Sequence, residues 1–476
     1  MPFPGDLDKQ GGPAKQLKYE GPSIGWVNNY NANPDAAGMT LQVPTTDGAG
    51  HLTFGAGGGG ASTFNVMTYG ATGGGVVDDT TAINAAIAAL NATPGGRLYF
   101  PAGTYLTNSG TFTTVGVPCV IYGDGYNATT ILSKSTTGTV FTLDAGGTIH
   151  VYDLTITNGA ATAPTSGAAI LCPQTGPHPG NNVVLYNVGT NYFYDNIDLQ
   201  AIAGISRLDG CVFQSPVRYG LRIRNIAVPD SGGWYISNCN WYAGSLPLNN
   251  GGLHRISTAA LRWESCSNGH ISNCTMSGDI SHIANWTTHI DVAGVGGMGE
   301  LFISSCSLED PQNRQISITG ISQNVSIANT EISYNNNSYP TGGTAIFIDS
   351  CQAVSICGLV GNMATGPNFT KVVDFNASSC QKVNWSGIAV TGNWANLSCP
   401  VGYDAGAYDP QHGFSGDLIS SVNNCSALIN GTNVGQRMIV NDLLAAPVFN
   451  ATVTTGSGGG SNVAQVWWNG TAWKIG

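Results

Sequence analysis

The chain has 476 residues, and only 9% of them are charged, against about 25% in ordinary globular proteins. Glycine is abundant at 66 positions, but no Gly-X-Y period runs through the chain and hydrophobic residues still make up 42%, which excludes collagen and simple disorder. The net charge of −11 disfavours nucleic acid and anionic membranes as partners, because phosphate binding needs clustered positive charge, and it leaves a glycan open.

Residues 1 to about 60 are short segments interrupted by proline and glycine, and they end in the run GAGGGGAS at 55–62. This composition is typical of a flexible joint, so we expect a separate head segment at 1–60. The first residues lack a basic region followed by an apolar one, and no apolar run approaches the ~20 residues of a membrane span. We therefore expect neither Sec secretion nor membrane insertion.

The next segment carries the one convincing helical pattern of the sequence. Asp78 or Asp79 can cap its N-terminus, and a Pro-Gly-Gly sequence at 94–96 ends it. Three apolar residues form its buried stripe: Ile83, Ile87 and Leu90. A lone short helix ahead of hundreds of strand-like residues is expected to cover the end of the structure that follows.

From about residue 117 to 440 the sequence repeats in short, alternating apolar segments separated by Gly, Asn and Ser. Strand-like segments such as GLRIRN at 220 and ALRWES at 260 recur at intervals of mostly 24 to 30 residues, and a second strand follows most of them. This repeat predicts an all-β parallel β-helix over residues 61–440, in which each rung buries its apolar face against its neighbours.

Eight of the twelve cysteines close these strands in two sets, which are expected to form columns of buried, reduced thiols. One set is Cys239, Cys274, Cys306 and Cys357, and the other is Cys266, Cys351, Cys380 and Cys425. No CxxC pair and no HxxxH or HxH spacing occurs, so we expect no metal site and no cofactor.

After about residue 440 the sequence changes character. The segments VWW and TAW flank Asn469-Gly470, a favoured type I′ hairpin turn. An isolated hairpin is only marginally stable, so residues 441–476 are interpreted as a small trimerisation or capping unit.

The passage from Phe64 to Tyr105 reads TYGATGGGVVDDTTAINAAIAA followed by GGRLYFPAGTY. It resembles the opening segment of the pectate-lyase-like, right-handed β-helix proteins that are common among phage tailspikes. The resemblance implies a helix-capped right-handed coil, usually a homotrimer mounted on a phage tail, that binds and often cleaves a bacterial surface polysaccharide. The motif set of the polygalacturonases is missing, since Gly269-His270 is followed by isoleucine, so pectin hydrolysis is not expected.

Polar residues alternate with apolar ones along each first strand and are therefore expected to form an outward column. Because neighbouring rungs stack about 4.8 Å apart, Glu264 is expected beside Asp291, and such a carboxylate pair suits a glycosidase. One would protonate the glycosidic oxygen while the other acts as nucleophile or base, with the close like charges raising one pKa. Basic side chains that would bind acidic groups of the glycan are expected around them: Arg222, Arg224, Arg262 and His289.

A solvated surface is the alternative interpretation of this column. Opposite charges on neighbouring rungs form exposed pairs worth at most about 1 kcal/mol each, and an offset of one rung would change every pairing. Asp349 and Asp374 form a second candidate carboxylate pair. Trp234 and Trp241 offer flat faces for sugar rings, although buried or loop-anchoring positions are equally compatible with the sequence.

Three functions remain open from the sequence. The first is a virion receptor-binding tailspike that adheres to a bacterial surface polysaccharide and can depolymerise it. Residues 1–60 would then attach to other virion tail proteins, and the homotrimer would reach the virion tail after assembly in the host cytoplasm. The second is a purely adhesive or structural tail protein, and the third is a free polysaccharide lyase or hydrolase.

Overall fold

The computed structural model describes the chain from residue 62 to 475 with gaps, and two strands before it. The described residues are 42–46, 52–56, 62–173, 181–200, 205–224, 233–243, 256–264, 268–278, 285–321, 323–334, 343–363, 369–375, 380, 382–386, 389–392, 401–403, 414–416, 421–422, 437–443, 452–453, 462–468 and 471–475. The chain divides into two compact units, Met1–Gly60 and Ala61–Gly476. In the first unit, β1 (Gln42–Thr46) pairs antiparallel with β2 (Leu52–Ala56).

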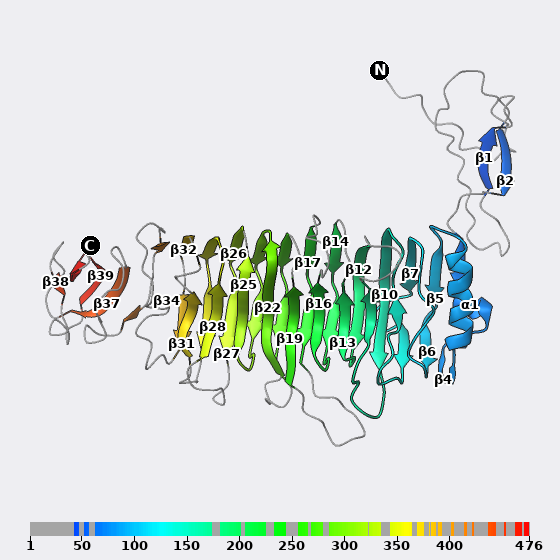
Figure 1. The fold of residues 1–476 in the computed structure, drawn as a ribbon, viewed down its shortest axis with the longest axis horizontal. Helices are drawn as coiled ribbons and strands as arrows, with labels where there is room; N and C mark the ends of the chain where they lie inside the picture. The colour runs from blue at the N-terminus through cyan, green and yellow to red at the C-terminus, as the bar shows by residue number, and fades with distance from the viewer. Residues whose placement is uncertain are drawn as a thin grey trace, which may run out of the picture. The chain divides into compact units, whose positions relative to one another are not determined.

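A helical cap opens the second unit, as the sequence predicts. After the 3-10 helix η1 (Val66–Tyr69), α1 (Thr80–Asn91) buries Ile83, Ile87 and Leu90 against the end of the coil (Figure 1). Both predicted acidic residues serve its N-terminus in different ways. The Asp78 carboxylate accepts from the Thr80 backbone N–H at 3.0 Å, while Asp79 is the N-cap residue and accepts from the Thr72 backbone N–H at 2.7 Å.

Three parallel sheets run along the coil, and two of them share the long strands β10 (Thr148–Asn158) and β12 (Asn182–Asn191). We call the sheet that begins with β3 the first sheet. Besides the shared strands it contains β3 (Thr63–Asn65), β5 (Arg97–Phe100), β7 (Cys119–Gly123), β14 (Ser206–Asp209), β17 (Trp234–Ser237), β20 (Gly269–Ser272), β23 (Leu301–Ser304), β26 (Asn324–Ala328), β29 (Ala353–Cys357), β32 (Lys382–Ser386) and β35 (Phe414–Gly416).

The second sheet begins with β4 and lies one corner further along each rung. Besides the shared strands it contains β4 (Gly74–Asp78), β6 (Gly103–Thr107), β8 (Thr129–Ser133), β15 (Val212–Gln214), β18 (Asn240–Tyr242), β21 (Thr275–Ser277), β24 (Ser307–Glu309), β27 (Glu331–Tyr334), β30 (Val360–Met363) and β33 (Ala389–Gly392).

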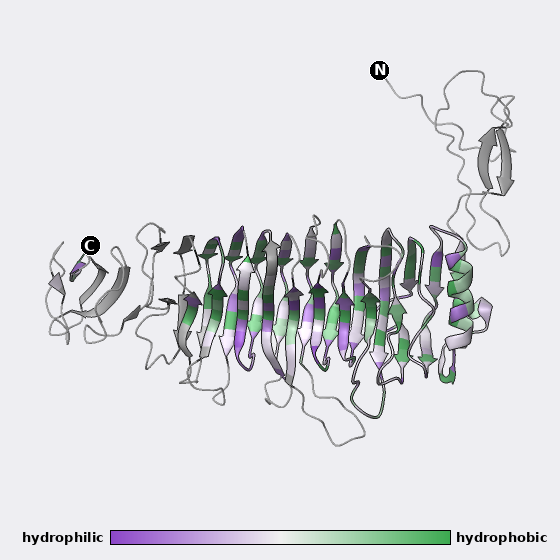
Figure 2. Ribbon diagram, viewed as in Figure 1, coloured by the Kyte–Doolittle hydropathy of each residue, from purple (hydrophilic) through white to green (hydrophobic). Residues whose placement is uncertain are grey.

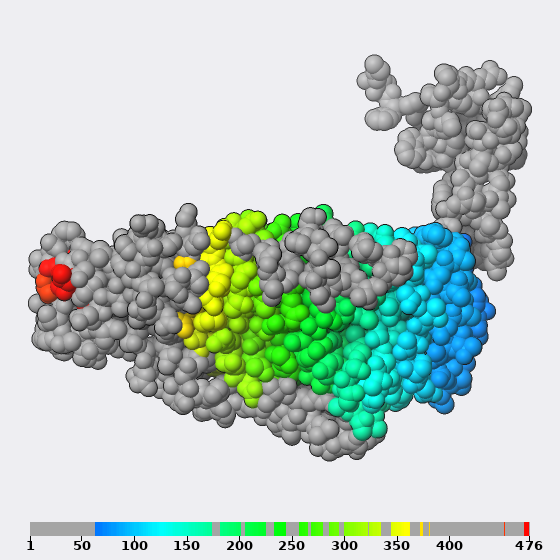
Figure 3. All heavy atoms as spheres, in the orientation of Figure 1, coloured from blue at the N-terminus to red at the C-terminus, as the bar shows by residue number. Residues whose placement is uncertain are grey.

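The third sheet is separate and has ten strands, which lie side by side in Figure 1. They are β9 (Phe141–Thr142), β11 (Ala168–Cys172), β13 (Asp195–Leu199), β16 (Tyr219–Arg224), β19 (Ile256–Glu264), β22 (Asn285–Met298), β25 (Arg314–Ile321), β28 (Gly343–Asp349), β31 (Phe369–Phe375) and β34 (Val401–Tyr403). Each rung passes through the third, first and second sheets in turn, so the predicted all-β, right-handed parallel β-helix with one capping helix is confirmed. In Figure 3 successive rungs form adjoining bands of colour along this coil.

Inward side chains stack in continuous apolar columns, which is what gives the coil its stability. In the first sheet Leu208, Ile236 and Ile271 pair in register, and each is fully buried. Complete burial of one such side chain stabilises the fold by about 1.5–3 kcal/mol, and the neighbouring rung supplies the contact. The outward positions between them are polar or aromatic, and Figure 2 shows this alternation along the strands.

The corner between the first and second sheets is a tight turn at a residue in the left-handed conformation. Successive rungs place Asn187, Gly210, Asn238, Asn273, Ser305, Asn329 and Gly358 there, with φ between 48° and 63°. Glycine and asparagine tolerate this region best, which explains their recurrence in the repeat. Asn238 adds a bond across rungs, since its side-chain Nδ2 donates to Asp209 Oδ1 at 2.7 Å.

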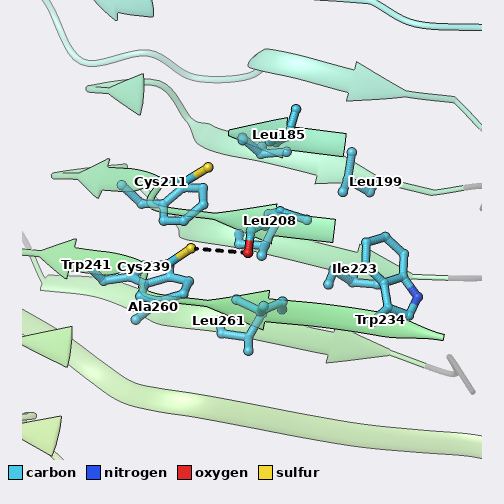
Figure 4. Packing of buried hydrophobic residues seen from close by; sticks show 14 of the residues in the cluster. Leu185, Leu199, Leu208, Cys211, Ile223, Trp234, Cys239, Trp241, Ala260 and Leu261 are labelled. Carbon is cyan, nitrogen blue, oxygen red and sulfur yellow. Dashed lines mark hydrogen bonds between the residues drawn. The ribbon is translucent and has the colours of Figure 1, made fainter. Parts of the chain in front are cut away.

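A column of cysteines follows this corner. It consists of Cys211, Cys239, Cys274 and Cys306, all at most 2% exposed, and Figure 4 shows the first two beside the Sγ–Leu208 carbonyl contact of 3.7 Å made by Cys239. Cys211 was not in the predicted set, and Cys357 was wrongly included, because it pairs with Ala328, two residues before the column. Cys266 and Cys425 lie outside the described residues. The nine described cysteines are free thiols, and burial raises the pKa of Cys119 to about 12.

The C-terminal strands form a further sheet of five. It contains β36 (Ser421–Val422), β37 (Arg437–Leu443), β39 (Asn462–Trp468), β40 (Trp473–Ile475) and β38 (Thr452–Val453). In this sheet β36 and β37 pair in parallel, and the other described pairings are antiparallel. The predicted hairpin is present, but Trp468 pairs with Trp473, so four residues rather than two connect its strands. Asn469-Gly470 itself lies outside the described residues. Within the described part of the chain no helix is both long and apolar enough to span a bilayer.

Candidate functional site

The charged residues predicted to face outward gather on the third sheet, on β13, β16, β19 and β22. We call Asp198, Arg222, Arg224, Arg262, Glu264 and Asp291 the charged cluster. Their side chains are 8% to 24% exposed, which is low for charged groups on a sheet surface. Such burial strengthens each pairing compared with a fully solvated one, and it also makes any unpaired charge costly.

The register differs from the predicted one by two residues. Arg262 pairs with Asp291, whereas Glu264 pairs with Ala293, so the two carboxylates are diagonal neighbours on adjacent strands rather than directly opposite. Arg222 and Arg224 lie opposite Arg262 and Glu264 on the preceding rung. The prediction that Glu264 and Asp291 face outward on adjacent strands is therefore confirmed, and their direct pairing is wrong.

Arg262 connects the two candidate catalytic carboxylates. Its Nε donates to Glu264 Oε1 at 2.9 Å, and its Nη1 donates to Asp291 Oδ2. Arg222 Nη2 also donates to both carboxylate oxygens of Glu264, to Oε2 at 2.9 Å and to Oε1 at 3.2 Å. Four side chains thus form one row of alternating charge across three rungs, in the order Arg222, Glu264, Arg262 and Asp291.

Two further ion pairs lie beside this row of charged side chains. Arg224 donates to both oxygens of Asp198, at 2.8 and 3.2 Å, in a bidentate arrangement. Arg218 donates in the same way to Asp195, and its guanidinium lies over the ring of Tyr194 at 4.6 Å. Asp195 and Arg218 were missed in the sequence, because Asp195 is in phase with the inward residues Ile197 and Leu199, and Arg218 lies one residue before its strand.

The pairing sets the ionisation of Glu264. Burial opposes the charged form, but the hydrogen bonds from Arg262 and Arg222 outweigh it and lower the pKa of Glu264. Burial likewise opposes the charge of Arg262, whose pKa is nevertheless raised by hydrogen bonds and attraction to Glu264 and Asp291. Glu264 is therefore an ionised acceptor in this arrangement, and the raised pKa that a general acid needs is absent from it.

His289 does not belong to this surface, and its predicted outward position is wrong. The ring is 0% exposed, and burial lowers its pKa to about 3. The alternation breaks within β22, where Thr288, His289 and Ile290 are all buried. Gln315 and Ile316 are likewise both buried on β25.

Trp234 and Trp241 are also buried, at 0% exposed, and the prediction that they face a glycan is wrong. Trp234 faces inward on β17 together with Ile236, while Trp241 stacks on Phe213 at a centroid distance of 4.7 Å. Figure 4 shows both tryptophans among the buried hydrophobic residues. Their sequence neighbours Tyr235 and Tyr242 face outward instead, and these side chains are 40% and 42% exposed.

Asp349 and Asp374 lie away from the charged cluster. Asp374 pairs with Phe347 and Asp349 with Thr319, so the two carboxylates are diagonal neighbours, not a direct pair. Two rungs of small or aromatic side chains, those of β25 and β28, separate Asp291 from Asp374. A search of the described residues finds no group of three or more His, Cys, Asp or Glu side chains that could hold a metal ion.

The comparisons with known proteins agree with this architecture. Residues 63–239 match the sequence model of the family "Rhamnogalacturonase A/epimerase, pectate lyase-like". The mannuronan C5-epimerase AlgE1 of Azotobacter vinelandii is 53% identical over 47 residues, which are 10% of this chain and 3% of that protein. The chain therefore spans only a small part of the curated relatives it matches.

Solved structures that are similar to this chain include a phage tailspike domain and an epimerase module. The enzymatically active domain of tailspike protein 2 from bacteriophage CBA120 has a TM-score of 0.50 at 12% identity, over 87% of this chain and 70% of that one. The A-module of the Azotobacter vinelandii epimerase AlgE4 has a TM-score of 0.44 at 15% identity, over 74% of this chain and 98% of that one. The likeness predicted from Phe64–Tyr105 is thus confirmed: residues 63–239 match the pectate-lyase-like sequence model, and the fold is a parallel β-helix like that of the tailspike domain.

Proposed function

We propose that this protein is a tailspike-type receptor-binding protein of a phage tail that binds a bacterial surface polysaccharide through the charged cluster of the third sheet. The cluster carries the proposal because it concentrates three arginines on one sheet surface of a protein with only 9% charged residues. Arginine offers five donors in a fixed fork that matches carboxylates, and each of these side chains keeps part of its surface in water.

An acidic sugar is the ligand that best fits this chemistry. Its carboxylate would compete with Glu264 and Asp291 for Arg222 and Arg262, replacing one set of charge-assisted bonds by another. The exchange requires little rearrangement of the backbone, since the arginines stand on paired strands.

The test is binding of purified capsular and lipopolysaccharide preparations, measured by biolayer interferometry. The double variant Arg222→Gln with Glu264→Gln removes one cation and one anion together, so no buried charge is left without a partner. Loss of the charge-assisted bonds should weaken binding about tenfold or more. Arg207→Gln on the first sheet is the matched control and should bind like the parent; equal binding by the double variant would contradict the proposal.

Depolymerisation is a second candidate function, because Arg262 holds two carboxylates in contact with one guanidinium group. The ionised Glu264 suits a nucleophile or base, and Asp291 is the second carboxyl group of the pair. Glu264→Gln and Asp291→Asn should each reduce chain cleavage by at least about a hundredfold while binding persists. Gel filtration of the polysaccharide before and after incubation measures this, and an inert parent protein would leave the purely adhesive function.

The remaining parts of the chain have proposed roles at the virion. Residues 1–60 would join the protein to other tail proteins, and residues 441–476 would cap or trimerise the coil. The separate contacts of Met1–Gly60 and the change from parallel to antiparallel pairing after β37 support these assignments. A homotrimer assembled in the host cytoplasm and carried on the virion tail is the form we propose.

A further inference from the structure

An aromatic ladder runs along the outward surface of the first sheet, away from the charged cluster. Tyr235, His270 and Phe302 pair in register on β17, β20 and β23. The rings of Tyr235 and His270 stack at 4.9 Å with an interplanar angle of 5°, and those of His270 and Phe302 at 4.8 Å and 12°. The ring spacing therefore equals the spacing of about 4.8 Å between strands.

The two ends of this aromatic ladder differ. At one end the Arg207 guanidinium lies over Tyr235 at 5.5 Å from the ring centroid. At the other end Phe302 pairs with Ser326 on β26, and Ser355 follows on β29. The ring face of Phe302 that points away from His270 is therefore followed by two small hydroxyl side chains.

The strands beyond Phe302 are uncharged. β26 reads NVSIA and β29 reads AVSIC, and their outward serines are partly or fully exposed, Ser355 more than Ser326. We call the change from the Phe302 ring to the small Ser326 side chain on the next strand the step. Beside it, Asn324 Nδ2 donates to Glu300 Oε1 at 2.8 Å, which provides polar groups at the border of the same step.

We propose that a pyranose ring of the polysaccharide occupies this step and stacks on the free face of Phe302, taking the place of the next ring of the ladder. This inference rests on the proposed function and adds to it a subsite for a neutral sugar. The C–H face of a pyranose would pack on the ring, while Ser326 and Ser355 would bond its hydroxyl groups. The absence of charge on β26 and β29 favours a neutral sugar over a uronate.

Saturation-transfer-difference NMR of the full chain tests the subsite. The probes are the methyl α-pyranosides of mannose, glucose and galactose, measured separately. Phe302→Leu keeps an apolar side chain but removes the flat face, and Ser326→Ile fills the step without adding a ring. Each should lower the saturation signal of the bound probe about threefold to tenfold, the range expected for the loss of one aromatic stacking contact.

Tyr235→Leu is the matched control, because both faces of Tyr235 are covered by Arg207 and His270. It removes a ring from the same ladder and should leave the signal unchanged. Equal signals from the parent and from Phe302→Leu with all three probes would overturn the subsite, as would a loss of self-association in Phe302→Leu, which would assign the step to a second copy of the chain.

The outcome is separable from that of the proposed function. Polysaccharide binding that depends on Arg222 but not on Phe302 would overturn the subsite alone. Pyranoside signals that depend on Phe302, in a protein that binds no polysaccharide, would support the subsite and contradict the proposed function.

Discussion

His289 is an unusual residue for the interior of an apolar coil. By register it lies between Ala260 and Gln315 on the neighbouring rungs, since Thr288 pairs with Ala259 and with Arg314. Both ring nitrogens of His289 and the Oε1 of Gln315 are buried without a hydrogen-bond partner among the described residues. The neutral imidazole is therefore tolerated there, and the charged form is strongly disfavoured.

This burial predicts a loss of stability in acid. The pKa of His289 is about 3 in the folded protein against 6.5 for the free side chain, so the unfolded chain binds a proton that the folded chain excludes between these values. Stability that is present above pH 6.5 is lost as the pH falls through this window, by up to about 1.4 kcal/mol per pH unit.

His289→Gln should reduce this dependence, because Gln315 shows that the next rung accommodates glutamine at the same place. Melting temperatures of parent and variant between pH 7 and pH 4.5 measure it. Parallel curves for the two proteins would show that His289 does not control the acid response.

The left-handed corner is the feature that recurs most regularly among the elements. Seven consecutive rungs from Asn187 to Gly358 use it, and Ser305 is the only member of that series that is neither asparagine nor glycine. A left-handed residue other than Gly costs roughly 1–2 kcal/mol, and asparagine is the side chain that tolerates it best after glycine. Ser305 is therefore the weakest corner of the described series.

Ser305→Asn should raise the stability of the coil by about 0.5 kcal/mol, and Asn273→Ala should lower it by about 1 kcal/mol. Differential scanning calorimetry at one scan rate compares the variants with the parent. Opposite signs in the two variants are the expected result, and a destabilised Ser305→Asn would mean that the serine makes contacts that asparagine loses.

The period of these elements made the coil predictable from the sequence, whereas the site was only partly so. Alternation correctly placed Arg222, Glu264 and Asp291 on one outward surface. It failed for His289 because consecutive residues of β22, His289 and Ile290, are both buried, and for Trp234 because the phase of a strand depends on where its corner falls. The pairing of Glu264 with Ala293 was missed because the loops between rungs differ in length, so the sequence alone does not show which residues of adjacent strands lie opposite each other.

At the scale of the molecule, the second unit contains its own core. Its buried cluster extends from Val66 to Cys380, and most contacts of each unit are internal. Removal of residues 1–60 should therefore leave a folded coil. The circular dichroism spectrum should match that of the full chain. The melting temperature should agree within about 3 °C, because in a large domain a change of about 1 kcal/mol in the free energy of unfolding shifts it by only a few degrees. An unfolded product would place the head in the folding core.

We predict a homotrimer in solution, since the coil exposes broad surfaces of low charge that include Tyr186 at 51% and Ile205 at 55% exposed. Mass photometry should give a species of three chains. A single-chain species at micromolar concentration would contradict the trimer and with it the proposed role of residues 441–476.

The constant register of the rungs also bears on how such a protein changes over generations. Ile303 pairs with Ile327, 24 residues further on, while Ile236 pairs with Ile271, 35 residues further on, yet both steps add one rung of the same geometry. The excess length lies in the connecting segments. Insertions, deletions and recombination between related genes can therefore alter the segments beside the strands without disturbing the interior, and a lineage could acquire a new host through such exchanges while inheriting its scaffold unchanged.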